Sequence, residues 1–379
     1  MSMVLNEEQR LLKDTIDDFL STNAPTDQLR RLRDTHDDKG YSIILWNQLT
    51  ELGVPSILMP KEFGGFGFGF KGLGAVMQSM GRNLTASPLF STVVLGASAI
   101  ELGGTASQQQ ALLPTIAAGQ LTLALAIDET HHHQPINTAV RLKERNGQLT
   151  ITGEKVFVLD GHSADKLVVV VRSSGNPGDT KGLSLVLVDS NAAGLQTNRI
   201  QYMDGRNAAN IIFNNVRVKQ DQVIGELGGA HTIVQQVLDR GVIAISAEML
   251  GGCQEVFDRT LQYLREREQF GVKIGTFQAL QHRAAQMFCQ LERSKSAVLS
   301  ALSSLDKNSP DISLQASLAK TLINDCYQHV SNEAIQMHGG MGITDELDIG
   351  LFLKRARVSL QILGDSDYHK NRYAQLMGY

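Results

Sequence analysis

The chain has 379 residues, of which 42% are hydrophobic and 20% are charged, as is usual for a globular protein with a sizeable core. At about 150 residues per domain, this length predicts two or three domains. The net charge of −4 excludes the basic surface that binding to nucleic acid or an anionic membrane requires. The uncharged tract at residues 83–100 contains proline, glycine and several hydroxyl residues, so it is too polar to span a bilayer.

The three cysteines, Cys253, Cys289 and Cys326, are widely spaced in segments with a helical pattern. An odd, dispersed set excludes a disulfide framework and a CxxC metal site, and it favours a reducing compartment. Residues 1–8 contain neither a basic stretch nor an apolar one, so no signal peptide is predicted. We therefore expect a cytoplasmic protein.

The N-terminal third has the apolar spacing of helices. In residues 5–22, apolar side chains recur every three or four positions and acids occupy the first turn, which predicts an amphipathic helix. Further helical stretches follow, separated by turns that contain glycine or proline, at 41–52, 71–82, 89–103 and 106–118. We expect residues 1–120 to form an all-helical domain.

The period then changes, and residues 121–229 are expected to form a middle domain built on an antiparallel sheet. Short β-branched runs occupy 121–127, 148–159, 166–171, 183–188 and 209–213. Clusters of Asp, Asn and Gly bound these runs and no helical pattern intervenes, which favours hairpins over βαβ units.

The helical period returns at about residue 230. Long helical stretches are expected at 231–265, 277–304, 314–337 and 347–362. Only Pro310 interrupts the sequence beyond residue 178, as long helices require. Helices of this length normally pack in antiparallel bundles. The predicted fold class is therefore α+β, with a helical domain, a middle β domain and a C-terminal four-helix bundle over 230–379.

Several motifs have plain structural interpretations. Residues 67–72 match G-x-G-x-x-G, but glycines interrupt any preceding strand and no acid occurs between Glu62 and Glu101, so we predict a glycine-rich turn into a helix. Three consecutive imidazoles at 131–133 cannot all face one ion, which predicts a polar loop and no metal site. His338 and His369 are expected to be structural.

Two glycine-containing segments are more informative. In 265–278, Arg267 ends one helix and the N–H groups after Gly275 open the next, which is an anion site in principle. In 336–342, three glycines end a helix and permit close approach of the backbone to a ligand. The alternatives are a helix corner with solvated charges and a simple C-cap with its turn.

Six segments together carry a family resemblance: Leu5–Gln9, Pro60–Gly65, Gly153–Lys155, the R-x-x-F-G stretch Arg267–Gly271, Phe277-Gln278, and the QxxGGxG stretch Gln336–Gly342. With these motifs the chain resembles the acyl-CoA dehydrogenase family over nearly its whole length. The resemblance implies the α, β, α-bundle fold, a bound FAD, and usually a tetramer made of dimers.

The resemblance also assigns cofactor residues. It places Arg267, Phe270 and Gln278 at the FAD pyrophosphate and adenosine of a neighbouring subunit. It places Gln336 and Gly340 among the residues that reach FAD across the dimer interface. Arginine and helix-start amides suit a pyrophosphate on physical grounds.

In the middle domain, the resemblance makes Phe157 the aromatic residue that stacks on the isoalloxazine. Glu129 matches the acid of the family segment T-E-P-x-A-G-S-D, but residues 130–133 lack the Gly and Ser that contact the flavin. Leu159 replaces a hydroxyl residue that commonly bonds the flavin near N5.

The implied reaction desaturates an acyl-CoA thioester. A carboxylate base removes the α-proton, which the thioester acidifies, and the β-hydrogen leaves as hydride to flavin N5. The electrons then pass to an electron-transfer flavoprotein, as expected in lipid metabolism. The length, branching and ring content of the acyl chain stay open.

The base is the main departure from the family. The usual catalytic segment I-Y-E-G-T corresponds to residues 362–366, where Leu363 holds the glutamate position. In some members the base lies at a position that corresponds to Gly241. Two acids are in reach by sequence: Asp365, two residues past the usual position, and Glu248, two helical turns beyond Gly241 on the same face. The alternative for Glu248 is a buried structural ion pair, for example with an arginine.

A second hypothesis is that this chain has no base. Residues 363–365 followed by His369, with Ser246–Glu248, resemble the small-subunit branch of the pimeloyl- and steroid-type enzymes. Such chains often pair with a different dehydrogenase-like subunit, so both a homotetramer and a heterotetramer are considered. The chain would then be a flavin-binding, non-catalytic subunit. A third hypothesis is other flavin chemistry on this fold, such as nitroalkane oxidation with an aspartate base.

Overall fold

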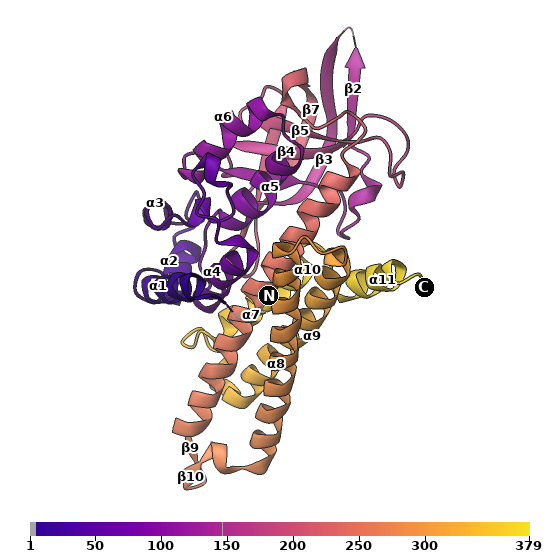
Figure 1. The fold of residues 1–379 in the computed structure, drawn as a ribbon. Helices are drawn as coiled ribbons and strands as arrows, with labels where there is room; N and C mark the ends of the chain where they lie inside the picture. Colours follow the sequence, from indigo (N-terminus) through magenta and orange to yellow (C-terminus); the bar gives the residue numbers. More distant parts are fainter. Residues whose placement is uncertain (1–4, 146) are drawn as a thin grey trace. The chain divides into compact units, whose positions relative to one another are not determined.

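The computed structural model describes residues 5–145 and 147–379 (Figure 1). Helices come first, a sheet follows, and helices return, which confirms the predicted fold class. The chain forms two compact units. We call them the helical unit, made of residues up to Arg31, Phe68–Thr85 and Val242–Tyr379, and the sheet unit, made of Leu32–Gly67 and Ala86–Gly241. Within the described ranges, no helix combines the length and the apolar character needed to cross a membrane.

The sheet unit contains an eight-stranded sheet in the order β6-β7-β3-β2-β4-β5-β8, with β1 beside β4. The strands are β1 Leu123–Ala126, β2 Arg141–Arg145, β3 Gln148–Leu159, β4 Lys166–Arg172, β5 Leu183–Asp189, β6 Leu195–Gln201, β7 Asn207–Val218 and β8 Val223–Ile224. Most pairs are antiparallel as predicted, but β1 and β2 run parallel to β4, so the sheet is mixed. The sequence patterns did not predict β2, β6 or β8.

The helices of the sheet unit are α3 Ile43–Glu51, α5 Ser98–Gly103 and α6 Ala106–Ala117. The π-helical segment η3, Phe90–Ala97, precedes α5, and all its residues are buried. Its hydroxyl groups bind the sheet: Thr92 Oγ1 accepts the N–H of Leu123 at 3.0 Å, and Ser91 Oγ donates to Asp160 at 2.6 Å. The long uncharged tract is therefore explained by burial against β1.

The helical unit is built on α1 Glu7–Asn23, α4 Gly69–Asn83, α8 Gln278–Asp306, α9 Ile312–His338, α10 Ile349–Gln361 and α11 Ser366–Leu376. Two further helices, α2 Thr26–Asp34 and α7 His231–Glu266, contribute residues to both units. α8 lies along α9, and α9 also packs against α10 and α11 (Figure 1). The predicted four helices of the bundle are therefore joined by a fifth, α11.

Glycines bring α4 and α7 into backbone contact. A Cβ atom at Gly81 would lie 1.9 Å from the carbonyl oxygen of Glu248, and one at Gly251 would lie 2.0 Å from that of Gln78. Only glycine leaves room for this approach. The contact fixes the turn of α7 that carries Glu248.

The G-x-G-x-x-G match is a turn into α4, as predicted. A short 3₁₀ turn at Lys61–Phe63 precedes it, where a dinucleotide site would need a strand. The first N–H groups of α4, those of Phe70 and Lys71, donate to the carboxylate of Asp306 at 2.6 and 3.3 Å. A protein carboxylate therefore occupies the helix N-terminus where a phosphate would bind.

Candidate active-site regions

A bulge in β3 displays Phe157. The register between β3 and β7 shifts between Lys155 and Val158, so extra β3 residues face Asn210. Phe157 adopts a left-handed backbone with φ of 54°, and its N–H donates to Asn210 Oδ1 at 3.2 Å. A bulky residue in this conformation costs about 1–2 kcal/mol, and such strain and such bulges cluster at functional sites.

The Glu129 carboxylate is held inside the sheet unit by several donors. Lys155 Nζ donates to Glu129 at 2.6 Å and to the carbonyl of Ile127 at 2.8 Å. The N–H groups of Ala139 and Val140 donate to the same carboxylate at 2.8 and 3.1 Å. Burial lowers the pKa of Lys155, although Glu129 beside it favours the charged form. These bonds tie the loop after β1 to the strand that carries Phe157.

The histidine loop lies next to the same aromatic side chain. His133 Nδ1 is 2.9 Å from the Asp128 carboxylate, and the His131 ring centroid is 5.6 Å from that of Phe157. Tyr202 also stacks on Phe157, with centroids 6.3 Å apart and planes at 16°. Among the described residues, no three His, Cys, Asp or Glu side chains are grouped to hold a metal ion.

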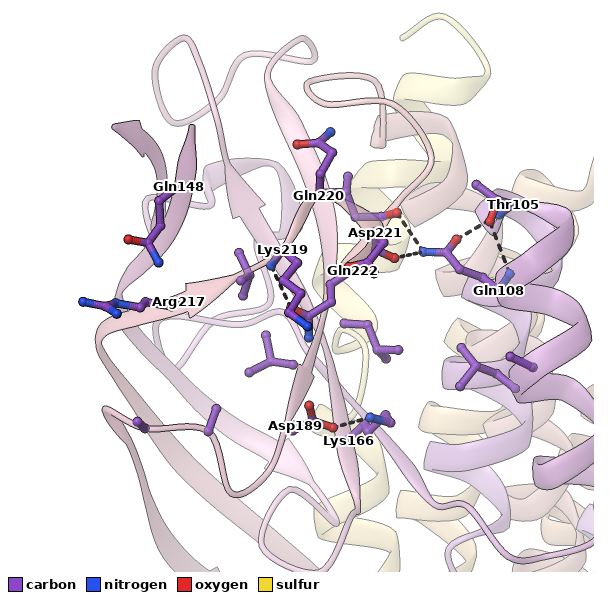
Figure 2. A pocket seen from close by; sticks show the side chains of 18 of the residues that line it. Thr105, Gln108, Gln148, Lys166, Asp189, Arg217, Lys219, Gln220, Asp221 and Gln222 are labelled. Atoms are coloured by element: carbon purple, nitrogen blue, oxygen red, sulfur yellow. Dashed lines mark hydrogen bonds and ion pairs between the residues drawn. The ribbon is translucent and has the colours of Figure 1, made fainter. Parts of the chain in front are cut away.

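A cavity of about 1240 Å³ with both polar and apolar lining residues occupies another part of the sheet unit (Figure 2). Lys166 is paired with Asp189 at its wall, and Gln108 donates to the carbonyls of Asp221 and Val223. No residue that the sequence singled out for catalysis or cofactor binding lines this cavity. The cavity is therefore separate from the region around Phe157.

In the helical unit, Glu248 forms a buried ion pair. Arg355 of α10 donates to the Glu248 carboxylate at 3.1 Å, and the two residues are 3% and 7% exposed. This is the arrangement that the sequence offered as the alternative to a catalytic role. Because the guanidinium of Arg355 neutralises the Glu248 carboxylate and holds it in place, the pair has the features of a structural ion pair.

Asp365 lies in a braced turn between α10 and α11. Its Oδ1 accepts the N–H of Tyr368 at 2.8 Å, so the side chain caps α11, and it is half-buried. Leu363 and Gly364 both have positive φ, 57° and 107°, and the carbonyl of Leu363 accepts a bond from His369 Nε2 at 3.0 Å. His369 is buried with both ring nitrogens within reach of partners, as expected for a structural histidine.

The R-x-x-F-G stretch forms a two-stranded hairpin, β9 Glu268–Gln269 and β10 Val272–Lys273. Phe270 and Gly271 at its tip both have positive φ, 55° and 78°, as in a type I′ turn. The turn leaves Phe270 92% exposed, and Arg267 and Gln278 are exposed as well. An aromatic side chain held in the solvent by a strained turn indicates a binding surface.

The QxxGGxG stretch ends α9. Gln336 and Gly340 are exposed, and a Cβ atom at Gly339 or Gly340 would meet nothing within 4 Å. The preceding His338 ring stacks on Tyr263 of α7 with centroids 4.2 Å apart, and its Nδ1 lies 2.7 Å from the Ala334 carbonyl. The stretch therefore offers open backbone at a braced helix end, which suits close approach of a ligand.

Asp348, at the start of α10, anchors the segment that follows the glycines of the QxxGGxG stretch. Its carboxylate accepts bonds from Thr26 at 2.7 Å, from Arg30 at 2.8 Å and from Arg259 at 2.6 Å. Burial alone would raise the pKa of Asp348, but these donors hold it below the usual 3.8. The network links α2, α7 and the start of α10.

Replacing Asp348 by asparagine is expected to destabilise the fold by about 1–3 kcal/mol at neutral pH, because charged hydrogen bonds are lost. A carboxyl group whose pKa is lowered in the folded state stabilises the fold at pH values above its ordinary pKa. This contribution is lost as the pH falls through the pKa that the group has in the folded state. The difference in melting temperature between wild type and Asp348→Asn should therefore shrink below about pH 4. Asp345→Asn is the control, because Asp345 also pairs with Arg30 but is 61% exposed. A difference that is constant down to pH 3 would contradict this assignment.

The structure thus gathers the singled-out residues in separate groups. Phe157 and Glu129 are joined through Lys155; Arg267 and Phe270 share the hairpin; Gln336 and Gly340 share the end of α9. Glu248 and Asp365 lie on different elements with different partners. Sequence reasoning did not assign roles to Lys155, Tyr202 or Arg355, because no local pattern reveals a tertiary partner.

Comparison with known proteins gives a consistent result. Family models for the acyl-CoA dehydrogenase N-terminal, middle and C-terminal domains match residues 6–120, 129–216 and 228–378. The chain is 27% identical over 365 residues to a probable acyl-CoA dehydrogenase of Bacillus subtilis, with 94% of each chain covered. It is 25% identical, again with 94% of each covered, to the CarC subunit of a caffeyl-CoA reductase–Etf complex of Acetobacterium woodii. A ChsE4–ChsE5 complex from Mycobacterium tuberculosis has the same fold, with a TM-score of 0.90, 21% identity and full coverage of both chains.

Proposed function

Because the chain belongs to the acyl-CoA dehydrogenase family, whose members are oxidoreductases that act on the CH–CH group of acyl-CoA, we propose that it binds FAD and desaturates an acyl-CoA thioester between Cα and Cβ. The observation that carries this proposal is the Phe270–Gly271 turn, which exposes an aromatic ring in the same short stretch as the exposed Arg267. FAD, when bound, supplies the acceptor for the β-hydride.

The residues present fit this cofactor. Arg267 provides a guanidinium for the pyrophosphate, Phe270 and Gln278 suit the adenosine, and the open backbone at Gly340 with the exposed Gln336 admits close approach. In the sheet unit Phe157 would stack on the isoalloxazine. Glu129 would contribute by positioning the loop after β1, since its carboxylate is bound to Lys155.

Asp365 is our candidate for the base that removes the α-proton. Its Oδ1 accepts one backbone N–H, and Oδ2 has no hydrogen-bond partner among the described residues, so a lone pair is available for a proton. Glu248, in contrast, is buried against Arg355. We propose that Glu248 stabilises the fold through this ion pair, and we keep it as the second candidate for the base.

We propose an electron-transfer flavoprotein as the redox partner. The Acetobacterium woodii relative is a subunit of a reductase–Etf complex, which is consistent with such a partner. That relative is a reductase, so the same site could run the desaturation in reverse. The reduction potential of the acyl-CoA couple decides which direction is favoured.

A non-catalytic role in a heteromer is the alternative, and one observation favours it: both candidate acids already have structural partners. In that case the chain would complete the FAD sites of a second dehydrogenase-like subunit. The exposed hairpin and α9 end would serve in either assembly, a homotetramer or a heterotetramer.

The decisive experiment uses the purified chain alone. Its visible flavin absorption is recorded, and linear, branched, dicarboxylic and steroid-side-chain acyl-CoA thioesters are then added without oxygen. We expect a flavin spectrum that one class of thioester bleaches. Flavin that bleaches only after co-expression with a second dehydrogenase-like subunit would establish the alternative. A chain that binds no flavin in either form would overturn the proposal.

A further inference from the structure

Tyr202 is placed by the turn that joins β6 to β7. Its N–H donates to the carbonyl of Arg206 at 3.1 Å, and its carbonyl accepts the N–H of Gly205 at 3.0 Å. Because both strands around this turn belong to the sheet, the backbone of Tyr202 has a defined position. The side chain is half-buried, and burial raises the pKa of its hydroxyl, so Tyr202 is neutral at all physiological pH values.

The Tyr202 ring stacks on the Phe157 ring, with planes at 16° and centroids 6.3 Å apart. His131 contacts the same ring, with planes at 50°. We call His131, Phe157 and Tyr202 the aromatic cluster. Its members come from three segments: the loop after β1, the β3 bulge and the β6–β7 turn.

The β3 bulge fixes the Phe157 backbone but not the angle of its ring. The Phe157 N–H donates to the Asn210 side chain, and the neighbouring Val156 N–H donates to the backbone carbonyl of Asp128 at 2.8 Å, so two hydrogen bonds hold the main chain here. Rotation about the side-chain bonds moves the ring against His131 and Tyr202, whose rings lie beside it. A stacked aromatic pair contributes about 0.5–1.5 kcal/mol beyond its buried area, enough to select one orientation.

We propose that Tyr202 is a positioning residue for the flavin: its ring holds the Phe157 ring at the angle that stacks on the isoalloxazine. This inference rests on the proposed function, because it requires that Phe157 contact FAD. His131 is exposed whereas Tyr202 is half-buried, so Tyr202 is the member of the cluster that we assign to this role.

The test is a titration of FAD into the cofactor-free protein, followed by flavin fluorescence and by visible circular dichroism. Tyr202→Leu removes the ring and should weaken FAD binding by about 2- to 10-fold while changing the dichroism of the bound flavin. Tyr202→Phe keeps the ring and should restore both. Met203→Leu is the matched control, because Met203 lies in the same turn and is 61% exposed.

Melting curves of the cofactor-free variants separate this role from a general loss of structure. If Tyr202→Leu melts much earlier than wild type, Tyr202→Met replaces it, since methionine retains more of the side-chain volume without a ring. A ring-free variant with wild-type affinity and dichroism would overturn the inference and leave the proposed function intact. If the wild type itself binds no FAD, the proposed function fails and the inference fails with it.

Discussion

Replacing Arg355 by leucine is expected to lower the free energy of unfolding by about 3–5 kcal/mol, because Glu248 then keeps a buried charge without the guanidinium that neutralises it. This loss is a large fraction of the total stability of a domain, which is about 5–15 kcal/mol. Chemical denaturation followed by helical circular dichroism measures it directly.

Arg357→Leu is the matched control for this variant. Arg357 lies on the same helix but is exposed, and it donates to Asn332 at 3.0 Å, so its loss should cost less than about 1 kcal/mol. The double variant Glu248→Leu with Arg355→Leu should regain most of the lost stability, since both charges are gone. Equal stability of Arg355→Leu and Arg357→Leu would mean that the buried pair is not structural.

Replacing Asp365 by asparagine is expected to slow the bleaching of the bound flavin by acyl-CoA about 10²- to 10⁴-fold, the usual contribution of a general base. Asparagine caps a helix about as well as aspartate, so α11 should be unaffected. The change therefore separates the proton acceptor from the helix cap. Anaerobic stopped-flow absorbance measures the rate.

Two further variants complete this test. Asp365→Ser also preserves the cap and should be equally slow, whereas Ser366→Ala removes only a hydroxyl that binds Asp325 and should bleach normally. Wild-type bleaching by Asp365→Asn would show that Asp365 is not the base. If Glu248→Gln then bleached slowly at a temperature where it is folded, the base would be Glu248.

The long helices could be predicted closely from the sequence. The expected stretches 231–265 and 277–304 correspond to His231–Glu266 and Gln278–Asp306, because a sustained apolar period leaves little choice. β6 was missed because its residues are polar and mostly exposed, so they show no alternation. α11 was missed because its only buried residue is His369. Local sequence patterns do not predict an element that is stabilised by contacts with other parts of the fold instead of by its own apolar period.

The candidate site divides in the same way. Arg267 and Phe270 lie in a contiguous motif, so the sequence could identify them, although the positive φ that exposes Phe270 became visible only in the structure. The sequence predicted a buried ion pair for Glu248 but not that Arg355, 107 residues away, forms it, and it carried no signal for the contact of Tyr202 with Phe157. The roles assigned to these residues remain predictions.

The exposed Phe270 hairpin has a consequence for handling the protein. If its ring and Arg267 bind the FAD of a neighbouring subunit, cofactor affinity and subunit association are linked, and each strengthens the other by mass action. Dilution would then release flavin even at a fixed flavin concentration. The flavin-to-protein ratio after gel filtration would report the association constant as much as the intrinsic affinity of any one chain.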